Sequence, residues 1–249
     1  MRKRIVAIIL LLVICGLAVL LLVFNGSLWF NMPLKSQYPV RGVDVSNYQG
    51  EIDWDILSGE DIQFAFIKAT EGSTFVDPYF AENWQGASET DLIIGGYHFF
   101  SFESAGETQA ENVIATLPLE SGTLPPVVDV EYYGDFAKDP PDYEKVTTEL
   151  RILLNRLEEY YGVPPIIYST YAAYNEYLST DFISYPLWIR DVRSKPNLTN
   201  GASWLFWQYS DHGYLDGYVG DERYIDLNVF NGTIEELRDT LIEAKHSPI

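Results

Sequence analysis

The chain has 249 residues, 47% of them hydrophobic and 21% charged, which is enough for one large domain and an additional segment. Its formal net charge of −20 argues against a nucleic-acid-binding protein, because contacts to phosphates require clusters of Lys and Arg. A single cysteine excludes a disulfide framework, and the three histidines are too scattered for a zinc site, so we expect no metal or other cofactor.

Residues 5–24 form an uncharged apolar run of about the length that a helix needs to cross a bilayer. Three basic residues precede the run, so the positive-inside rule places a tail of residues 1–4 in the cytoplasm and the rest of the chain outside. The alternative is a signal peptide that is cleaved before secretion, but its apolar core is normally about 7–15 residues long. We therefore expect a single-pass anchor in the cell membrane, followed by a stalk at 25–38.

From residue 39 onward, short apolar runs alternate with amphipathic stretches. Several runs are almost entirely apolar, which is typical of strands that are covered on both faces. The predicted strands are 41–45, 64–69, 92–100, 126–132, 165–170, 185–190, 203–210 and 223–230.

Two of the amphipathic stretches have clear helical patterns. In 144–160, apolar residues recur at helical spacing, and Gly162 with the following prolines ends the helix. A second helix begins at Thr233, which forms a capping-box pattern with Glu236. Its buried face is predicted to contain Ile234, Leu237, Leu241 and Ala244.

Eight strands with intervening helices predict a single α/β domain at 39–249, an irregular TIM-like β/α barrel. The connection from residue 210 to residue 222 is too short for a long helix. We therefore expect a barrel that is short of helices near the C-terminus, and its last strands could be antiparallel.

Four acidic residues lie at the ends of predicted strands. Asp44 is on the first strand, Asp129 and Glu131 are on the fourth, and Asp226 is on the last. In a β/α barrel the catalytic residues lie at the C-terminal ends of strands. A carboxylate at the end of an apolar strand is costly to bury unless it is paired or functional, so we predict that these four acids form a catalytic site.

Asp129 and Glu131 are two residues apart, so their side chains project from the same face of a strand. Two carboxyls this close separate each other's pKa values, so that one can stay protonated while the other is ionised. Such a pair suits cleavage of a glycosidic bond, because the leaving oxygen needs a proton and the sugar carbon needs a nearby negative charge.

Aromatic residues make up 15% of the chain and could stack on sugar rings or fill the barrel core. His98, at the end of the third predicted strand, could bond to a sugar or a carboxylate if it faces the cleft, and otherwise has a structural role. The aromatic candidates for substrate binding are Tyr132, Tyr168, Trp188, Trp207 and Tyr209.

Several stretches together resemble glycoside hydrolase family 25, the Chalaropsis-type lysozymes or N-acetylmuramidases. They follow the family order and cover about residues 40–232. The matching stretches are GVDVSNYQGEIDW at 42–54, FAFIKATEG at 64–72, GGYHFF at 95–100, PPVVDVE at 125–131, IIYST at 166–170, PLWIRDV at 186–192, WQYSDHG at 207–213 and IDLNVF at 225–230.

The resemblance implies an irregular β/α barrel that cuts the β-1,4 bond between N-acetylmuramic acid and N-acetylglucosamine. It implies that Glu131 is the general acid/base and that Asp129 helps the substrate acetamido group to attack. Asp44 and Asp226 resemble further acids of the cleft. The cleft positions Tyr97, Tyr168 and Trp188 also match. The stretch IRDV at 189–192 departs from the family, which usually has a small residue and an aromatic residue after the tryptophan.

Two alternatives remain. One is an endo-N-acetylglucosaminidase or chitinase-like hydrolase on the same type of barrel, although Val127 stands where such enzymes carry a further acid. The other is a non-catalytic peptidoglycan-binding module. The expected partners are the glycan strands of peptidoglycan and, through the N-terminal helix, the membrane. We expect a monomer.

Overall fold

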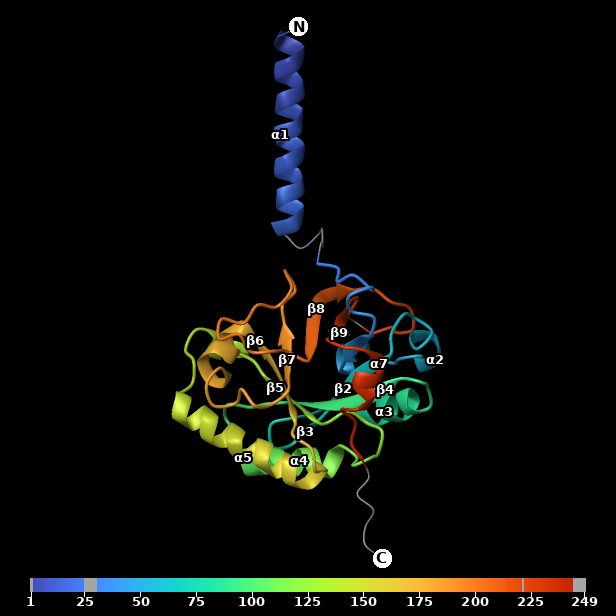
Figure 1. The fold of residues 1–249 in the computed structure, drawn as a ribbon, viewed down its shortest axis with the longest axis vertical. Helices are drawn as coiled ribbons and strands as arrows, with labels where there is room; N and C mark the ends of the chain where they lie inside the picture. The colour runs from blue at the N-terminus through green and yellow to red at the C-terminus, as the bar shows by residue number, and fades with distance from the viewer. Residues whose placement is uncertain (1, 25–30, 221, 244–249) are drawn as a thin grey trace, which may run out of the picture. The chain divides into compact units, whose positions relative to one another are not determined.

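The computed structural model describes residues 2–24, 31–220 and 222–243. It divides into two compact units, residues 1–32 and residues 33–249. The first unit contains helix α1 (Arg2–Phe24), shown in blue in Figure 1. The segment Arg4–Leu21 of this helix has a mean hydropathy of 3.0 and makes no buried contacts. Its length and composition suit a membrane span, as they would a signal sequence.

The second unit is built around a closed barrel. The strand order is β1-β9-β8-β7-β6-β5-β4-β2, and a pairing between β1 and β2 closes the ring. Within this ring all pairings are parallel except those of β9, which is antiparallel to both of its neighbours. The barrel strands are β1 (Arg41–Val45), β2 (Phe64–Glu71), β4 (Ile93–Phe99), β5 (Val127–Val130), β6 (Ile166–Thr170), β7 (Leu187–Arg190), β8 (Phe206–Gly213) and β9 (Ile225–Phe230).

These strands correspond to the eight that the sequence predicts, so the expected barrel and its antiparallel last strand are confirmed. A ninth strand, β3 (Phe75–Val76), was not predicted. It pairs with the end of β2 as a short antiparallel extension of the sheet.

Helices cover mainly the first half of the barrel. In Figure 1, α4 (Gly106–Thr116) and α5 (Tyr143–Tyr161) lie together along one side of the domain. Their backbones approach so closely that a Cβ atom on Gly106 would lie 2.0 Å from the carbonyl oxygen of Glu149. The remaining helical elements are η1 (Asn47–Gln49), α2 (Trp54–Leu57), α3 (Phe80–Ser88), η2 (Gly134–Ala137), α6 (Tyr171–Ala173), the π-helical η3 (Tyr174–Leu178) and α7 (Ile234–Arg238).

The second half of the barrel has fewer helices, as expected. Among the described residues, the connections from β7 to β8 and from β8 to β9 contain no helix. Helix α7 has the predicted capping box between Thr233 and Glu236. It is shorter than predicted, because it ends at Arg238, so Leu241 lies beyond it. Ala244 lies outside the described residues.

Two layers of apolar residues flank the sheet. An outer layer lies between the strands and the covering helices. An inner cluster fills the barrel, and Gly42 makes room there because a Cβ atom would lie 2.5 Å from the ring of Phe64. Leu237 of α7 belongs to this cluster, so α7 closes the end at which the parallel strands begin. The buried members are Val40, Phe64, Phe66, Leu124, Val127, Ile166, Tyr168, Trp188, Phe206, Phe230 and Leu237.

The segment before β1 is part of this compact unit. Tyr38 is buried against Trp204 and Trp207. The carbonyl oxygen of Pro33 accepts a hydrogen bond from Arg41. The unit thus includes residues 33–38, which we expected in the stalk, whereas residues 25–30 of that stalk lie outside the described residues.

Candidate active site

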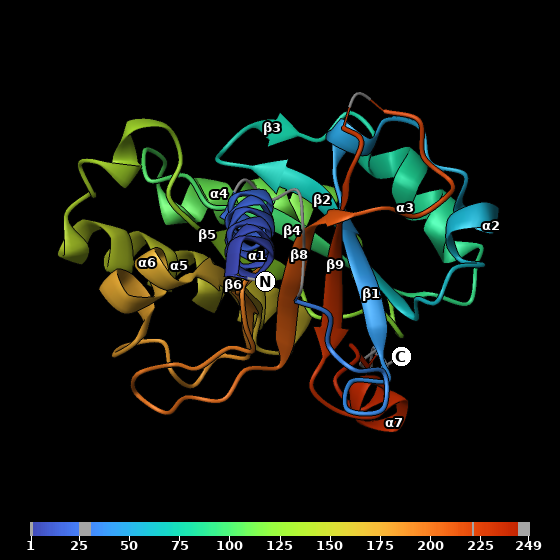
Figure 2. The same cartoon turned by 90° about the horizontal axis from the view of Figure 1, so that it is seen from above.

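A cavity of about 440 Å³ opens at the end of the barrel where the parallel strands finish. In a β/α barrel, active sites lie at this end of the strands. Figure 2 shows the domain from above, with β1, β9 and β8 side by side. The lining residues are Asp44, Val45, Ser46, Tyr48, Gln49, Lys68, Tyr97, Phe99, Asp129, Glu131, Tyr168, Trp188, Gln208, Asp211, His212, Glu222, Tyr224 and Asp226.

All four acids predicted from the sequence line this cavity. Asp44 of β1 and Asp226 of β9 are direct partners in the antiparallel pairing, so their side chains share one face of the sheet. Asp129 lies on β5, between Phe99 of β4 and Tyr168 of β6. The fold therefore brings together carboxyls from three strands that are far apart in the sequence.

Two chains of hydrogen bonds converge on one oxygen of Asp44. In one, Trp188 Nε1 donates to Asn228 Oδ1 (2.9 Å), and Asn228 Nδ2 donates to Asp44 Oδ2 (2.7 Å). In the other, the Tyr168 hydroxyl donates to Gln208 Oε1 (2.9 Å), and Gln208 Nε2 donates to Asp44 Oδ2 (3.0 Å). The indole N–H can only donate, which fixes the direction of the first chain. Asp44 is therefore held as an acceptor of two amide N–H groups.

Asp226 is the protonated partner of Asp44. Burial, followed by the nearby Asp44 and Asp211 carboxyls, raises the pKa of Asp226 to about 9. Burial also raises the pKa of Asp44, but hydrogen bonds from Asn228, Gln208 and Asp226 oppose that rise. At neutral pH the proton therefore resides on Asp226, which donates a hydrogen bond to Asp44.

Asp129 and Glu131 form the second pair of acids. Burial, followed by the Glu131 carboxyl, raises the pKa of Asp129 well above its ordinary range. Within the described residues, Asp129 Oδ1 is buried and has no hydrogen-bond partner, which further disfavours the charged form. Burial also raises the pKa of Glu131, against the opposing charge of Arg190. The pair can thus hold a proton at neutral pH, as a general acid requires.

Two cations lie beside this pair, each held by an acid of its own. Lys68 Nζ pairs with Glu71 Oε2 at 3.0 Å and lies over the rings of Phe75 and Phe99. An irregularity in the pairing of β2 with β4 follows Lys68, and such bulges redirect side chains near active sites. On the other side, Arg190 of β7 pairs with Asp211 of β8.

Three of the predicted substrate-binding residues line the cavity: Tyr97, Tyr168 and Trp188. Burial and the surrounding carboxyls raise the pKa of the Tyr97 hydroxyl well above its ordinary range. Trp188 is almost fully buried and stacks on Phe66, with ring centroids 4.6 Å apart. Its hydrogen bond to Asn228 indicates that it supports the acids from below as well as lining the cavity.

His98 lies outside the cavity lining and is buried between the sheet and α4. Gln109 Nε2 donates to two backbone carbonyls, and Gln109 Oε1 lies 3.1 Å from His98 Nε2. His98 Nε2 is therefore the protonated nitrogen, and Nδ1 accepts from the Thr70 hydroxyl at 2.8 Å. Burial lowers the pKa of His98 to about 4, so the ring is a neutral structural group.

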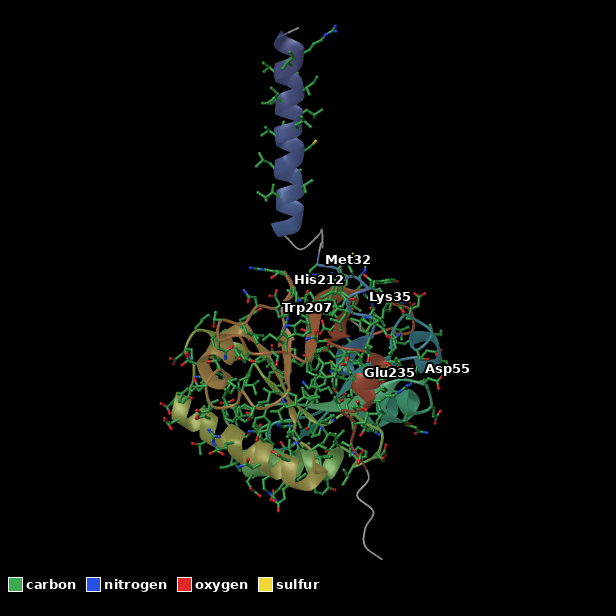
Figure 3. All side chains as sticks on the ribbon, viewed as in Figure 1. Met32, Lys35, Asp55, Trp207, His212 and Glu235 are labelled. Carbon is green, nitrogen blue, oxygen red and sulfur yellow. The ribbon has the colours of Figure 1, made fainter. Side chains whose placement is uncertain are left out.

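The other three aromatic candidates also lie outside the cavity lining. Tyr132 contacts Phe102 and Tyr177 in the outer layer. Trp207 is buried in the core, where its Nε1 donates to the carbonyl oxygen of Asp191, and in Figure 3 it lies further into the domain than His212 of the same strand. Tyr209 is likewise buried, and its hydroxyl accepts a hydrogen bond from Arg41.

Sequence reasoning did not single out several residues that form the site. Gln208 and Asn228 are polar residues within apolar strands, a pattern that could have identified them because buried polar groups must be paired. Lys68 also ends an apolar run. Tyr48, Glu222 and Tyr224 come from connecting segments, where the sequence gives no comparable signal.

Comparisons with known proteins agree with this geometry. The sequence model of glycosyl hydrolases family 25 matches residues 43–218. The uncharacterized protein YegX of Escherichia coli K12 is 37% identical over 88% of this chain and 79% of its own length. Lysozyme M1 of Streptomyces globisporus is 32% identical over 80% of this chain and 70% of its own length. A solved family 25 glycosyl hydrolase from Bacillus anthracis has a TM-score of 0.79 at 48% identity, covering 84% of this chain and 95% of that one.

Proposed function

The chain belongs to glycosyl hydrolase family 25 and is a glycoside hydrolase, and we propose that it is a peptidoglycan muramidase. The bond that it would cleave is the β-1,4 linkage from N-acetylmuramic acid to N-acetylglucosamine. The observation that carries this proposal is the pair of Asp129 and Glu131 in a cavity that Asp44 and Asp226 also line. The similarity to a lysozyme of Streptomyces globisporus supports the same substrate.

In the proposed mechanism Glu131 is the general acid. It is less buried than Asp129 and directly follows β5, so its carboxyl can meet the glycosidic oxygen at the barrel mouth. Glu131 donates its proton to the leaving oxygen as the bond to the muramic acid carbon breaks. The resulting carboxylate then removes a proton from the water that attacks the same carbon.

Asp129 assists the substrate rather than attacking it. The acetamido N–H of muramic acid donates a hydrogen bond to Asp129, which favours the ionised form of that carboxyl. The proton shared by the two acids then resides on Glu131, where it is needed. The acetamido oxygen, made more nucleophilic, bonds to the anomeric carbon, and water later opens this ring with net retention of configuration.

The chitinase-like alternative is disfavoured by the strand that carries the pair. Enzymes of that type have a further acid two residues before the position of Asp129, and this chain has Val127 there. Val127 is fully buried in the apolar cluster inside the barrel, where an ionised side chain would be costly.

The nature of the cleaved bond provides the test. Full-length protein in detergent is incubated with purified peptidoglycan, the new reducing ends are reduced with borohydride, and the amino-sugar alcohols are identified after acid hydrolysis. Muramitol is the expected product. Glucosaminitol would instead identify an endo-N-acetylglucosaminidase, and the absence of new reducing ends from folded protein would contradict hydrolysis altogether.

We further propose that α1 anchors the enzyme in the cell membrane, with residues 1–4 in the cytoplasm and the barrel outside. The apolar segment Arg4–Leu21 and the preceding basic residues support this orientation. A tethered enzyme would cut glycan strands only within reach of the membrane. We propose that it acts there as a monomer.

A further inference from the structure

The ion pair between Arg190 and Asp211 at the barrel mouth has no role in the mechanism described so far. Arg190 belongs to the stretch that departs from the family pattern by placing charge after the tryptophan. Its Nη2 contacts Asp211 Oδ2, and both side chains are about one-third exposed. An exposed surface pair needs no explanation, but this one adjoins the candidate acid.

The strand register sets the height of Arg190 relative to Glu131. Val130 is level with Ser169 of β6, and Thr170 of β6 is level with Arg190 of β7. Glu131, the residue after Val130, is therefore level with Arg190, two strands away. Neighbouring strands are about 4.8 Å apart, so the two backbones are about 10 Å apart, a distance that the long Arg and Glu side chains can span between them.

Arg190 and Glu131 also project from the same face of the sheet. Trp188, two residues before Arg190, lies inside the barrel, and Asp129, two residues before Glu131, lines the cavity. Side chains two residues apart on a strand share a face. The guanidinium and the Glu131 carboxyl thus both lie above the buried layer of the barrel, with Tyr168 below them.

Asp211 is held so that it fixes Arg190. Two irregularities in the pairing of β8 with β9 flank Ser210, and they turn the end of β8. Asp211 Oδ1 contacts His212 Nδ1, which leaves Oδ2 for Arg190. The neighbouring Asp191 accepts hydrogen bonds from the backbone N–H groups of Arg193 and Ser194 in its own loop.

We propose that Arg190 is a positioning residue for the general acid Glu131: Asp211 fixes a guanidinium at the barrel mouth, level with the Glu131 carboxyl and on the same face. This inference rests on the proposed function. It gives the charged departure from the family pattern a role in the reaction rather than in the surface alone.

Opposing influences act on the Glu131 carboxyl. Burial raises its pKa most, and the negative charge of Asp44 on β1 raises it further. Arg190 lowers this pKa more than any other group, and Lys68 of β2 lowers it to a smaller extent. The other titratable groups that line this cavity are Tyr48, Tyr97, Asp129, Tyr168, Asp211, His212, Glu222, Tyr224 and Asp226. Glu131 must give up its proton in the first step and regain one in the second. Without Arg190 the carboxyl would keep its proton to higher pH and would be slower to release it.

The test compares Arg190→Ala, Arg190→Lys and Asp211→Asn in the full-length protein in detergent. The titration of Glu131 is followed by NMR of ¹³C-carboxyl-labelled glutamate, with Glu131→Gln identifying the signal. The pH profile of kcat/KM on peptidoglycan is measured in parallel. Arg151→Ala is the matched control, because Arg151 pairs with Asp181 at 2.9 Å on the surface.

The two charge removals are expected to act in opposite directions. Arg190→Ala should raise the pKa of Glu131, and with it the midpoint of the alkaline limb of the kcat/KM profile, by roughly half a pH unit to one unit. Asp211→Asn should lower both, because the amide oxygen can still accept the hydrogen bond that holds Arg190 while the negative charge is removed. Arg190→Lys should lie nearer to the unmodified protein, and Arg151→Ala should leave the titration unchanged.

The inference would be overturned if the pKa of Glu131 in folded Arg190→Ala lay within about 0.2 units of the wild-type value, which is the precision of such a titration curve. Shifts of the same sign in Arg190→Ala and Asp211→Asn would also overturn it, since a general disturbance of the mouth predicts that result. Because NMR needs no substrate, the opposite shifts would uphold the inference even if peptidoglycan were not cleaved, an outcome that would contradict the proposed function alone.

Discussion

Asp44 and Asp226 face each other across the antiparallel pairing of β1 and β9, and they share one proton that resides on Asp226. Two amide N–H groups point at Asp44, so that carboxyl is the better place for the negative charge. The site thus combines a fixed negative charge at Asp44, a neutral acid at Asp226 and the proposed reactive pair, Asp129 on β5 and Glu131 directly after it. Each acid of the site has an environment of its own, which is how similar groups acquire different roles.

Replacing Asp226 by Asn should change how stability depends on pH. The pKa of Asp226 is raised in the folded protein, so the native state holds a proton that the unfolded chain releases between about pH 4 and pH 9. In this range the wild-type free energy of unfolding decreases as pH rises, through this group. Asp226→Asn removes that contribution. The melting temperature of the variant, relative to that of wild type, should therefore rise steadily from pH 4 to pH 9.

Asp135→Asn is a suitable control, because Asp135 is almost completely exposed. Its melting curve should stay parallel to that of wild type across the same range. A parallel curve for Asp226→Asn as well would mean that Asp226 is ionised in the native state. Activity gives a second comparison: at neutral pH Asp226→Asn should cost less than Asp44→Asn, which removes the fixed negative charge.

Glu131→Gln should abolish most of the activity without unfolding the protein. The amide has the same shape but cannot deliver a proton, so we expect kcat to fall about 10²-fold or more. The melting temperature should change little, because Glu131 lies at the partly exposed mouth of the barrel. Glu107→Gln, on the exposed surface of α4, is the control. Near wild-type clearing of cell walls by Glu131→Gln would remove this residue from the mechanism.

The sequence predicts the barrel strands well because each is a compact apolar run. Strand β3 escaped prediction because it has only two residues, Phe75 and Val76, and both are largely exposed. The sequence places Tyr38 in the predicted stalk, because a single tyrosine gives no periodic signal. In the structure it packs on two tryptophans that are distant in the sequence.

The faces of the strands were harder to predict than their existence. Tyr97 lines the cavity whereas His98 points into the outer layer, and Gln208 faces inward between the outward Trp207 and Tyr209. A strand that is apolar on both faces gives no alternation from which to assign sides, and a shift of one residue exchanges them. The acids were easier to place, since a carboxyl in an apolar run has few favourable positions other than the barrel mouth.

The proposed topology can be tested with protease. Cells whose wall has been removed are treated with a protease that cannot cross the membrane, and the barrel is followed with an antibody. If α1 is an uncleaved anchor with its basic end inside, the barrel should be digested in intact cells and should remain with the membrane fraction before digestion. Protection until lysis would reverse the orientation, and recovery of a shortened chain in the medium would indicate a cleaved signal peptide.

The role of Asp129 can be separated from that of a direct nucleophile by changing the substrate. Retaining enzymes with a carboxylate nucleophile need their two carboxyls about 5–5.5 Å apart, a spacing that a pair on one strand could also meet, so position alone does not distinguish the two mechanisms. If the acetamido oxygen attacks, removal of the acetyl group from muramic acid removes the nucleophile itself.

We therefore expect no cleavage at de-N-acetylated muramic acid, with normal cleavage of the same glycan after chemical re-acetylation as the control. Asp129→Asn should retain a neutral hydrogen-bonding group but lose the charge that supports the acetamido N–H, so its kcat should fall more than its KM rises. Direct attack would tolerate the free amine better and would form an ester between the sugar and Asp129. Detection of that ester by mass spectrometry, on protein quenched during turnover, would rule out substrate assistance.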